Sequence, residues 1–193
     1  MANLLRDRRS LIMSELKIFS EASPGEPELV STSHAGIADQ LRRIGVRFER
    51  WQAGIELSPG AGQDTVIDAY RQDIDRLMDQ EGYQSVDVIS LSPDHPDRKT
   101  LRNKFLSEHY HNEDEVRFFV KGKGLFSLHV GDKVYEVLCQ RGDLISVPAR
   151  TTHWFDMGPN PDFTAIRLFT NPEGWAANFT GSDIADRFSR LEN

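Results

Sequence analysis

The pattern of apolar and polar positions changes near residue 108. Before this point, apolar residues recur at intervals of three and four, a spacing typical of amphipathic helices. After it, short runs rich in Val, Phe, Ile and Leu alternate with turn signals such as Gly131–Asp132, a pattern typical of antiparallel strands. The sequence therefore predicts a mainly β protein with helices in its N-terminal part.

The N-terminal part is predicted to contain both helices and strands. Glycine readily takes the left-handed conformation that ends a helix, so two of the helices are expected to end at Gly45 and Gly82. Helices are expected after a cap at Ser33, after Asp64 or Thr65, and over residues 97–107. The expected strands are SELKIFSE (14–21), VRFERW (46–51) and VDVISL (86–91), with a loop rich in Pro, Gly, Ser and Glu at 21–32.

After residue 108 the chain is predicted to form a small antiparallel barrel or sandwich, because short strands follow one another at regular spacing. These strands are VRFFV (116–120), LFSLHV (125–130), KVYEVL (133–138), LISVP (144–148) and FTAIRLFT (163–170). We expect residues 1–12 to be a disordered extension and residues 13–193 to form one domain. Its parts are a helical and strand elaboration at 13–107, a barrel core at about 108–170 and a C-terminal segment at 171–193.

Charge and composition restrict the possible partners. The 193 residues include 23 basic and 30 acidic ones, a net charge of −7, so a nucleic-acid partner is not expected. No apolar run approaches the roughly 20 residues that span a bilayer, and no secretory signal follows Met1, so we expect a cytoplasmic protein without a membrane partner. The single cysteine, Cys139, excludes an internal disulfide and a thiolate-rich zinc site. No long heptad pattern supports assembly, and a monomer is expected.

Histidine and acidic residues form a candidate metal site. His109 and His111 are two residues apart, so on a strand both side chains point to one face. Glu115 and Arg117 keep this parity if the strand continues unbroken. His153 follows the turn PARTTH and is expected on a strand that folds back across the barrel. Imidazoles and a carboxylate that converge on one interior face suit a divalent transition metal.

Each of these residues also has a purely structural interpretation. A His-x-His pair is more often a polar strand face, Glu115 is compatible with a solvated acidic turn, and His153 beside Trp154 is compatible with a core histidine. The remaining histidines are expected to have no role at the site; they are His34, His95 and His129.

Two spacings taken together make the metal interpretation much stronger. His-x-His-x3-Glu-x6-Gly is met by residues 109–122, ending at Gly122, and Gly-x5-Pro-x4-His is met by residues 142–153. The pair resembles the double signature of the cupin superfamily, which implies a double-stranded β-helix, that is, a small antiparallel barrel with metal ligands on its inner wall. One position departs from this pattern, because Arg150 stands where cupins often have glycine.

Longer stretches narrow the resemblance to one family. HNEDEVRFFVKGKGLF, DLISVPARTTHWFDMG and FTAIRLFTNPEGWAANFTG resemble the acireductone dioxygenases of methionine salvage, as do GVRFERWQA and GYQSVDVISL, so that roughly residues 13–190 are covered. The resemblance implies that one Fe(2+) or Ni(2+) ion per chain is held by His109, His111, Glu115 and His153. It implies oxidative cleavage of 1,2-dihydroxy-3-keto-5-methylthiopentene by O2. With iron the products would be 4-methylthio-2-oxobutanoate and formate, and with nickel 3-methylthiopropanoate, formate and carbon monoxide.

Four further residues are candidates for contact with the substrate. Arg117 shares the parity of the ligands, so it is expected to point inward, where it either pairs with a carboxylate or stabilises charge on the substrate. Phe105, Phe155 and Trp175 are candidates for an apolar pocket around the methylthio group, although aromatic residues at such positions are often core residues.

Other functions remain compatible with the same residues. The chain is also compatible with another metal-dependent cupin dioxygenase or isomerase, or with a cupin that binds a small ligand without catalysis. A structural protein with accidental histidines is the least favoured alternative, because the joint spacing is specific.

Overall fold

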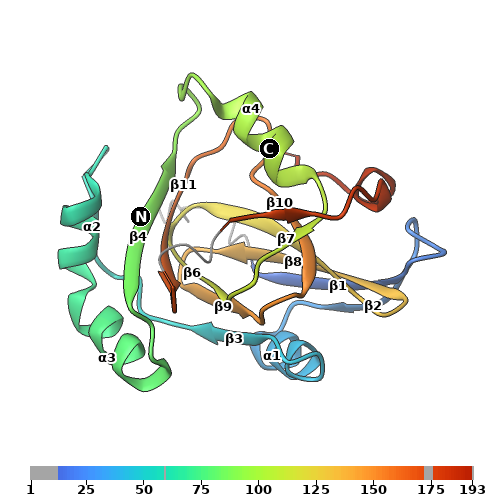
Figure 1. Cartoon of the computed structure of the whole chain (residues 1–193), viewed down its shortest axis with the longest axis horizontal. Coiled ribbons are helices and arrows are strands. Elements are labelled where there is room, and N and C mark those ends of the chain that lie inside the picture. Colours follow the sequence, from blue (N-terminus) through green and yellow to red (C-terminus); the bar gives the residue numbers. More distant parts are fainter. Residues whose placement is uncertain (1–12, 59, 172–175, 193) are drawn as a thin grey trace, which may run out of the picture.

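Two antiparallel sheets lie face to face around an apolar core (Figure 1). The computed structural model describes residues 13–58, 60–171 and 176–192. The larger sheet contains, in spatial order, β12 (Asn178–Phe179), β5 (His109–Tyr110), β10 (Thr152–Asp156), β7 (Lys123–Val130), β8 (Lys133–Gln140), β1 (Glu15–Ser20) and β2 (Pro27–Ser31). The smaller sheet contains β3 (Arg47–Arg50), β9 (Asp143–Val147), β6 (Glu115–Lys121), β11 (Phe163–Phe169) and β4 (Ser85–Leu91).

The predicted mainly β architecture with N-terminal helices is confirmed. All strand pairs in the described residues are antiparallel. The strands pair within two separate sheets, however, and do not close into one hydrogen-bonded barrel. The interior of the molecule is therefore enclosed by two facing sheets, and no continuous set of interstrand hydrogen bonds among the described residues surrounds it.

The helices follow the predicted order, with one break. Helix α1 (His34–Arg42) begins after Ser33, whose hydroxyl accepts a hydrogen bond from the Gly36 amide at 3.1 Å. The predicted second helix is two helices, α2 (Gln63–Ala69) and α3 (Arg71–Glu81), and α2 begins after Gly62 rather than after Asp64 or Thr65. The break is at Tyr70, which leaves the helical conformation and packs edge-on against Phe118 at 5.4 Å. Tertiary packing thus overrides the periodic pattern. The described residues also form helix α4 (Arg98–Leu106) and a short 3-10 helix (Ile184–Arg187).

Strand β6 is buried on both faces, and this position explains its continuous apolar sequence. Val116, Phe118 and Val120 belong to an apolar cluster with residues of α2 and α3, the two helices that lie beside β4 in Figure 1. Phe119 faces the opposite way, into the core between the sheets. Because side chains alternate along a strand, Arg117 shares this inward face, as predicted.

One further local prediction is wrong, and one condition stated above is not met. Residues 27–31 form strand β2 instead of a loop, because β1 offers a free edge with which they pair. The strand that carries His109 also does not continue to Glu115. It ends at Tyr110, and Glu115 begins β6 in the other sheet.

The cupin-type glycine Gly122 occupies a corner that admits no side chain. It lies between β6 and β7 with φ +72°, and a Cβ placed there would be 1.9 Å from the Asp162 carbonyl oxygen. Where cupins often have glycine, Arg150 adopts a positive φ of 65°, so the backbone conformation is kept despite the substitution.

Gly122→Ala is expected to lower the free energy of unfolding by about 3 kcal/mol or more, because left-handed strain adds to a clash with fixed backbone. Gly131→Ala is the matched control. Its φ is +66°, but a Cβ there meets nothing within 4 Å, so only about 1–2 kcal/mol should be lost. Urea unfolding of both variants checks this, and equal losses would show that the contact with Asp162 carries no cost.

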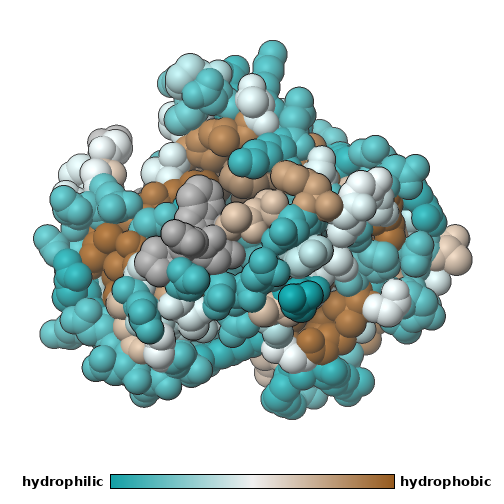
Figure 2. All heavy atoms as spheres, viewed as in Figure 1, coloured by the Kyte–Doolittle hydropathy of each residue, from teal (hydrophilic) through white to brown (hydrophobic). Residues whose placement is uncertain are grey.

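Polar residues cover most of the face shown in Figure 2, and apolar residues appear there in separate patches. In the part of the chain that the structure describes, no helix is both long and apolar enough to cross a membrane. Cys139 is buried, and its burial raises the pKa of the thiol well above its ordinary value.

Candidate functional site

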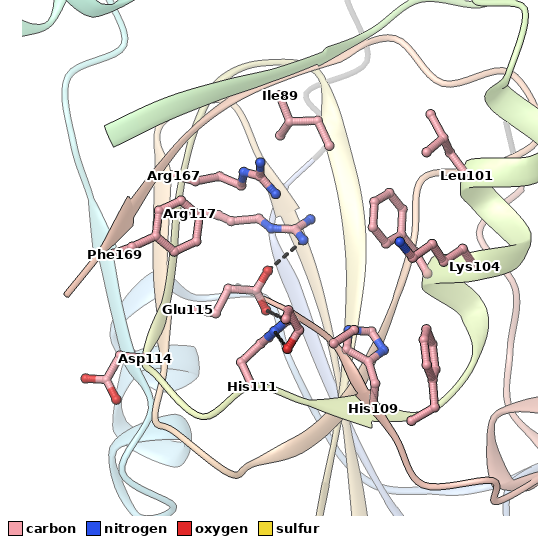
Figure 3. A pocket seen from close by; sticks show the side chains of 14 residues that line it. Ile89, Leu101, Lys104, His109, His111, Asp114, Glu115, Arg117, Arg167 and Phe169 are labelled. Atoms are coloured by element: carbon pink, nitrogen blue, oxygen red, sulfur yellow. Dashed lines mark hydrogen bonds and ion pairs between the residues drawn. The ribbon is translucent and has the colours of Figure 1, made fainter. Parts of the chain in front are cut away.

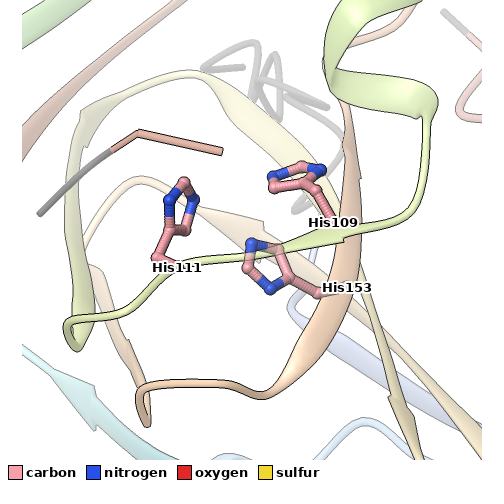
Figure 4. Close-up of side chains that lie close together, drawn as sticks. All are labelled: His109, His111 and His153. Carbon is pink, nitrogen blue, oxygen red and sulfur yellow. The ribbon is translucent and has the colours of Figure 1, made fainter. Parts of the chain in front are cut away.

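Three imidazoles converge between the two sheets (Figure 4). His109 lies on β5, His111 directly follows that strand, and His153 lies on β10, where it pairs in register with His109. One ring nitrogen from each lies within 4.8 Å of the other two. His109 and His153 are buried, and the His111 side chain is 11% exposed. The chain therefore brings together the three histidines that the sequence singles out, although they come from segments about forty residues apart.

The hydrogen bonds of the three rings leave the same nitrogen free. His109 Nδ1 lies 2.7 Å from the Ser107 carbonyl oxygen, His153 Nδ1 lies 2.8 Å from that of Thr151, and His111 Nδ1 lies 3.2 Å from that of Ala176. Because a carbonyl oxygen only accepts, each Nδ1 must carry the proton and donate it. The lone pair is then on Nε2, which is the arrangement of metal-binding histidines whose other nitrogen is held by a backbone carbonyl.

Burial favours the uncharged form of these rings. It lowers the pKa of His109 to about 4, and the neighbouring His153 lowers it further. It also lowers the pKa of His111. Both imidazoles are therefore neutral near neutral pH, as a metal ligand must be.

Glu115 adds a carboxylate to the cluster. Its Oε2 atom lies 2.8 Å from His153 Nε2 and 3.7 Å from His111 Nε2. Although burial raises the pKa of Glu115, the Arg117 guanidinium and the nearby imidazoles bring it well below its ordinary value, so the carboxylate is ionised.

The same atoms test whether a metal fits. Glu115 Oε2 and His153 Nε2 are buried and close, yet they are off the directions of a hydrogen bond, and neither has another hydrogen-bond partner among the described residues. Buried polar atoms without partners are costly. Two such atoms that face a common point, with two further imidazoles beside them, fit one divalent cation with nitrogen and oxygen ligands.

Arg117 lies against this cluster on the inward face of β6. Its Nη2 atom is 2.6 Å from Glu115 Oε1 (Figure 3), and the side chain is only 3% exposed. The rings of Phe155, Phe126 and Phe105 surround the guanidinium at 4.5, 5.0 and 5.9 Å. The first predicted alternative therefore applies, because Arg117 pairs with a carboxylate. Its Nε and Nη1 atoms have no hydrogen-bond partner among the described residues, and a contact with substrate charge stays a prediction.

A cavity of about 770 Å³ opens onto these residues. Its lining contains His109, His111, Glu115 and Arg117, which are polar, and an apolar wall to which β4, α4 and the segment around β12 contribute. That apolar wall includes Ile89, Leu101, Phe105, Phe169, Ala176, Ala177 and Phe179. Ile89 and Leu101 lie across the space from His109 and His111 (Figure 3), whereas Phe179 packs beside His109 at 5.7 Å.

The three predicted aromatic residues occupy different places. Phe105 lines the cavity. Phe155 is fully buried and does not line it; the ring packs edge-on against Phe105 at 6.4 Å and supports Arg117 from behind. Trp175 lies outside the described residues.

Two cationic residues of the cavity were missed from the sequence. Arg167, on β11, pairs in register with Arg117 and makes two hydrogen bonds to the carboxylate of Asp87, at 2.8 and 2.6 Å. It could have been noticed as the one charged residue within the otherwise uncharged stretch FTAIRLFT, which predicts a buried strand. Lys104 comes from α4 and directly precedes Phe105, and no signal in the sequence distinguishes it from the other basic residues of that helix.

The strand β12 is held beside the imidazoles by a buried glutamate. Glu108 accepts hydrogen bonds from the Thr180 hydroxyl and from His129 Nδ1, both at 2.6 Å. Strand β12 pairs with β5, and Ala176 just before it provides the carbonyl group for His111. His129 therefore has the structural role expected for it, at one remove from the cavity.

Comparisons with known proteins agree with this geometry. The model of the ARD/ARD′ family matches residues 15–177. The acireductone dioxygenase of Alcanivorax borkumensis is 62% identical over 178 residues, which cover 92% of this chain and 98% of that protein. The acireductone dioxygenase of Pseudomonas fluorescens is 61% identical over 181 residues, which cover 94% of this chain and 100% of that protein.

A solved structure extends the agreement to three dimensions. The acireductone dioxygenase from Bacillus anthracis, with a cadmium ion in its active center, superposes with a TM-score of 0.75 at 29% identity, over 86% of this chain and 98% of that one. The predicted cupin fold is confirmed by this match. The family match and the full-length identities agree, and the chain therefore belongs to the ARD/ARD′ family of enzymes.

Proposed function

We propose that this protein is a metal-dependent acireductone dioxygenase that binds one Fe(2+) or Ni(2+) ion per chain through His109, His111, Glu115 and His153. One observation carries the proposal. Three imidazoles, each with Nδ1 bound to a backbone carbonyl, meet an ionised carboxylate at a cavity that also contains Arg117. The membership of the family supports this assignment.

The bound metal would supply a Lewis-acidic centre that favours the ionised form of an enediol and orients it. The protein does the rest. Glu115 and the imidazoles of His109, His111 and His153 would hold that centre. Arg117 offers the N–H groups of two uncommitted nitrogens, Nε and Nη1, suited to an enediolate oxygen, and the surrounding rings exclude water, which strengthens these contacts.

The apolar wall suits the methylthio end of 1,2-dihydroxy-3-keto-5-methylthiopentene. Phe105, Ile89 and Leu101 offer it aliphatic and aromatic surface opposite the imidazoles. We propose that Phe105 contacts this group directly and that Phe155 acts through Phe105 and Arg117. A contact from Trp175 stays a prediction.

The products follow from the metal that is loaded. With iron we expect 4-methylthio-2-oxobutanoate and formate, the outcome that serves methionine salvage. With nickel we expect 3-methylthiopropanoate, formate and carbon monoxide. Both ions accept nitrogen and oxygen ligands of this kind, and intrinsic affinity favours nickel.

The experiment is a metal analysis followed by an oxygen-uptake assay. Purified protein should contain one transition-metal ion per chain by elemental analysis. Apo-protein reloaded with Fe(2+) or Ni(2+) should consume O2 when acireductone is added, and the two forms should differ in carbon monoxide release. Absence of uptake by both reloaded forms, or uptake by apo-protein, would overturn the proposed function.

A further inference from the structure

Lys104 is a cation at the cavity for which the described residues supply no ion-pair partner. Lys104 extends from α4 into the lining, and its nitrogen is directed toward the side of the cavity that holds Arg117 (Figure 3). The residue is exposed, and the described part of the chain offers its ammonium group no ion-pair partner. A lysine whose positive charge faces a cavity without a counter-ion is suited to attract an anion.

The other charged groups of this region are already engaged or lie elsewhere. Arg102 of the same helix makes two hydrogen bonds to the buried carboxylate of Asp156, at 2.7 and 2.9 Å. Arg167 is bound to Asp87. Asp114, an acid in the lining besides Glu115, accepts a hydrogen bond from the Ala149 amide at 2.8 Å, and its carboxylate points away from the other lining side chains in Figure 3.

The charge of the whole chain makes this position unusual. A net charge of −7 repels small anions from most of the surface. At 0.1 M salt, however, the Debye length is about 10 Å, so charges farther away than this are largely screened. The potential near a cation is then set mainly by that cation. An anion that approaches the protein is thus favoured at the Lys104 side of the cavity, whose lining also contains Arg117.

We propose that Lys104 is a substrate-recruiting residue, whose ammonium group attracts a small anion with ionised enolate oxygens to the cavity and releases it to Arg117 and the imidazole cluster. This inference rests on the proposed function, because it assumes that the substrate is anionic. Lys104 would then affect how fast the substrate binds and not the rate of the chemical step.

Lys104→Gln tests the inference, with Lys99→Gln as the matched control. Lys99 is exposed on the same helix but does not line the cavity. At low salt the metal-loaded Lys104→Gln protein should lose about fivefold in kcat/KM, the size expected of one solvent-screened ionic contact, with kcat within about twofold of the parent. The loss should shrink toward zero as salt is raised. Lys104→Arg should restore kcat/KM, and Lys99→Gln should match the parent throughout.

Parent-like kcat/KM in Lys104→Gln at low salt would overturn the inference, and so would a loss that persists at high salt or falls on kcat. An inactive parent protein would instead overturn the proposed function. Calorimetric titration of nickel-loaded protein with oxalate, a small dianion, decides the role of Lys104 without turnover. Binding about fivefold weaker in Lys104→Gln supports the inference, and equal affinity in parent and variant contradicts it.

Discussion

Glu115→Gln is expected to abolish metal retention and to lower the free energy of unfolding of the apo-protein by about 3–5 kcal/mol. Glutamine keeps the size of the side chain but removes the charge. The Arg117 guanidinium, 2.6 Å away and almost fully enclosed, would then be a buried cation without a counter-ion. Elemental analysis and urea unfolding measure the two effects separately.

The double variant Glu115→Gln/Arg117→Met separates the two roles of the carboxylate. It removes both charges, so stability should return close to that of the parent protein, while metal binding stays lost. Glu136→Gln is the control for replacing a buried glutamate. This carboxyl lies on β8 outside the cavity, and burial raises its pKa to about 7, so its neutral replacement should cost little and should leave the metal in place. Metal retention by the Glu115→Gln protein would refute the proposed ligand role.

Arg117→Met is expected to lower kcat by about 10²–10³-fold, the usual effect of removing a donor that stabilises developing charge. The metal content should stay near one ion per chain, since the imidazoles and Glu115 remain. The bound cation would also compensate the charge of Glu115 when Arg117 is gone. Steady-state oxygen uptake, with elemental analysis of the same samples, checks both statements.

Arg102→Met is the control for this variant, because it also breaks a buried ion pair, with Asp156, but away from the cavity. It should lose stability and keep kcat. A comparable fall of kcat in both variants would mean that loss of an ion pair alone disturbs the site. Equal loss of metal and turnover in Arg117→Met would assign Arg117 to metal binding.

The histidine cluster could be found from the sequence because its spacing follows from local backbone geometry. The elements His-x-His and Pro-x4-His place each imidazole at a fixed step from a turn, and the structure brings all three rings together. The strand of His109 nevertheless does not run on to Glu115, which is the condition for a shared parity. His109 and Glu115 lie in different sheets, and the loop between them crosses from one sheet to the other.

Features that depend on contacts between distant residues could not be predicted from the sequence. The break of the second helix at Tyr70 reflects packing on Phe118, which is distant along the chain. Phe155 is an aromatic residue of a type suited to a substrate pocket, but its ring is buried by residues that are distant in the sequence. Arg167 reaches the cavity because β11 pairs with β6. No local sequence pattern predicts this pairing.

The hydrogen bonds of the imidazoles have a consequence for how this protein can diverge. His109 and His153 each donate to the carbonyl group two residues earlier in the chain, at Ser107 and Thr151. The side chains at these two positions take no part in those bonds. Substitutions can therefore change these two side chains, while the backbone carbonyl groups still keep the proton of each imidazole on Nδ1. The two rings repeat one short backbone arrangement, so their orientation is inherited with the path of the chain and does not depend on any particular neighbouring residue.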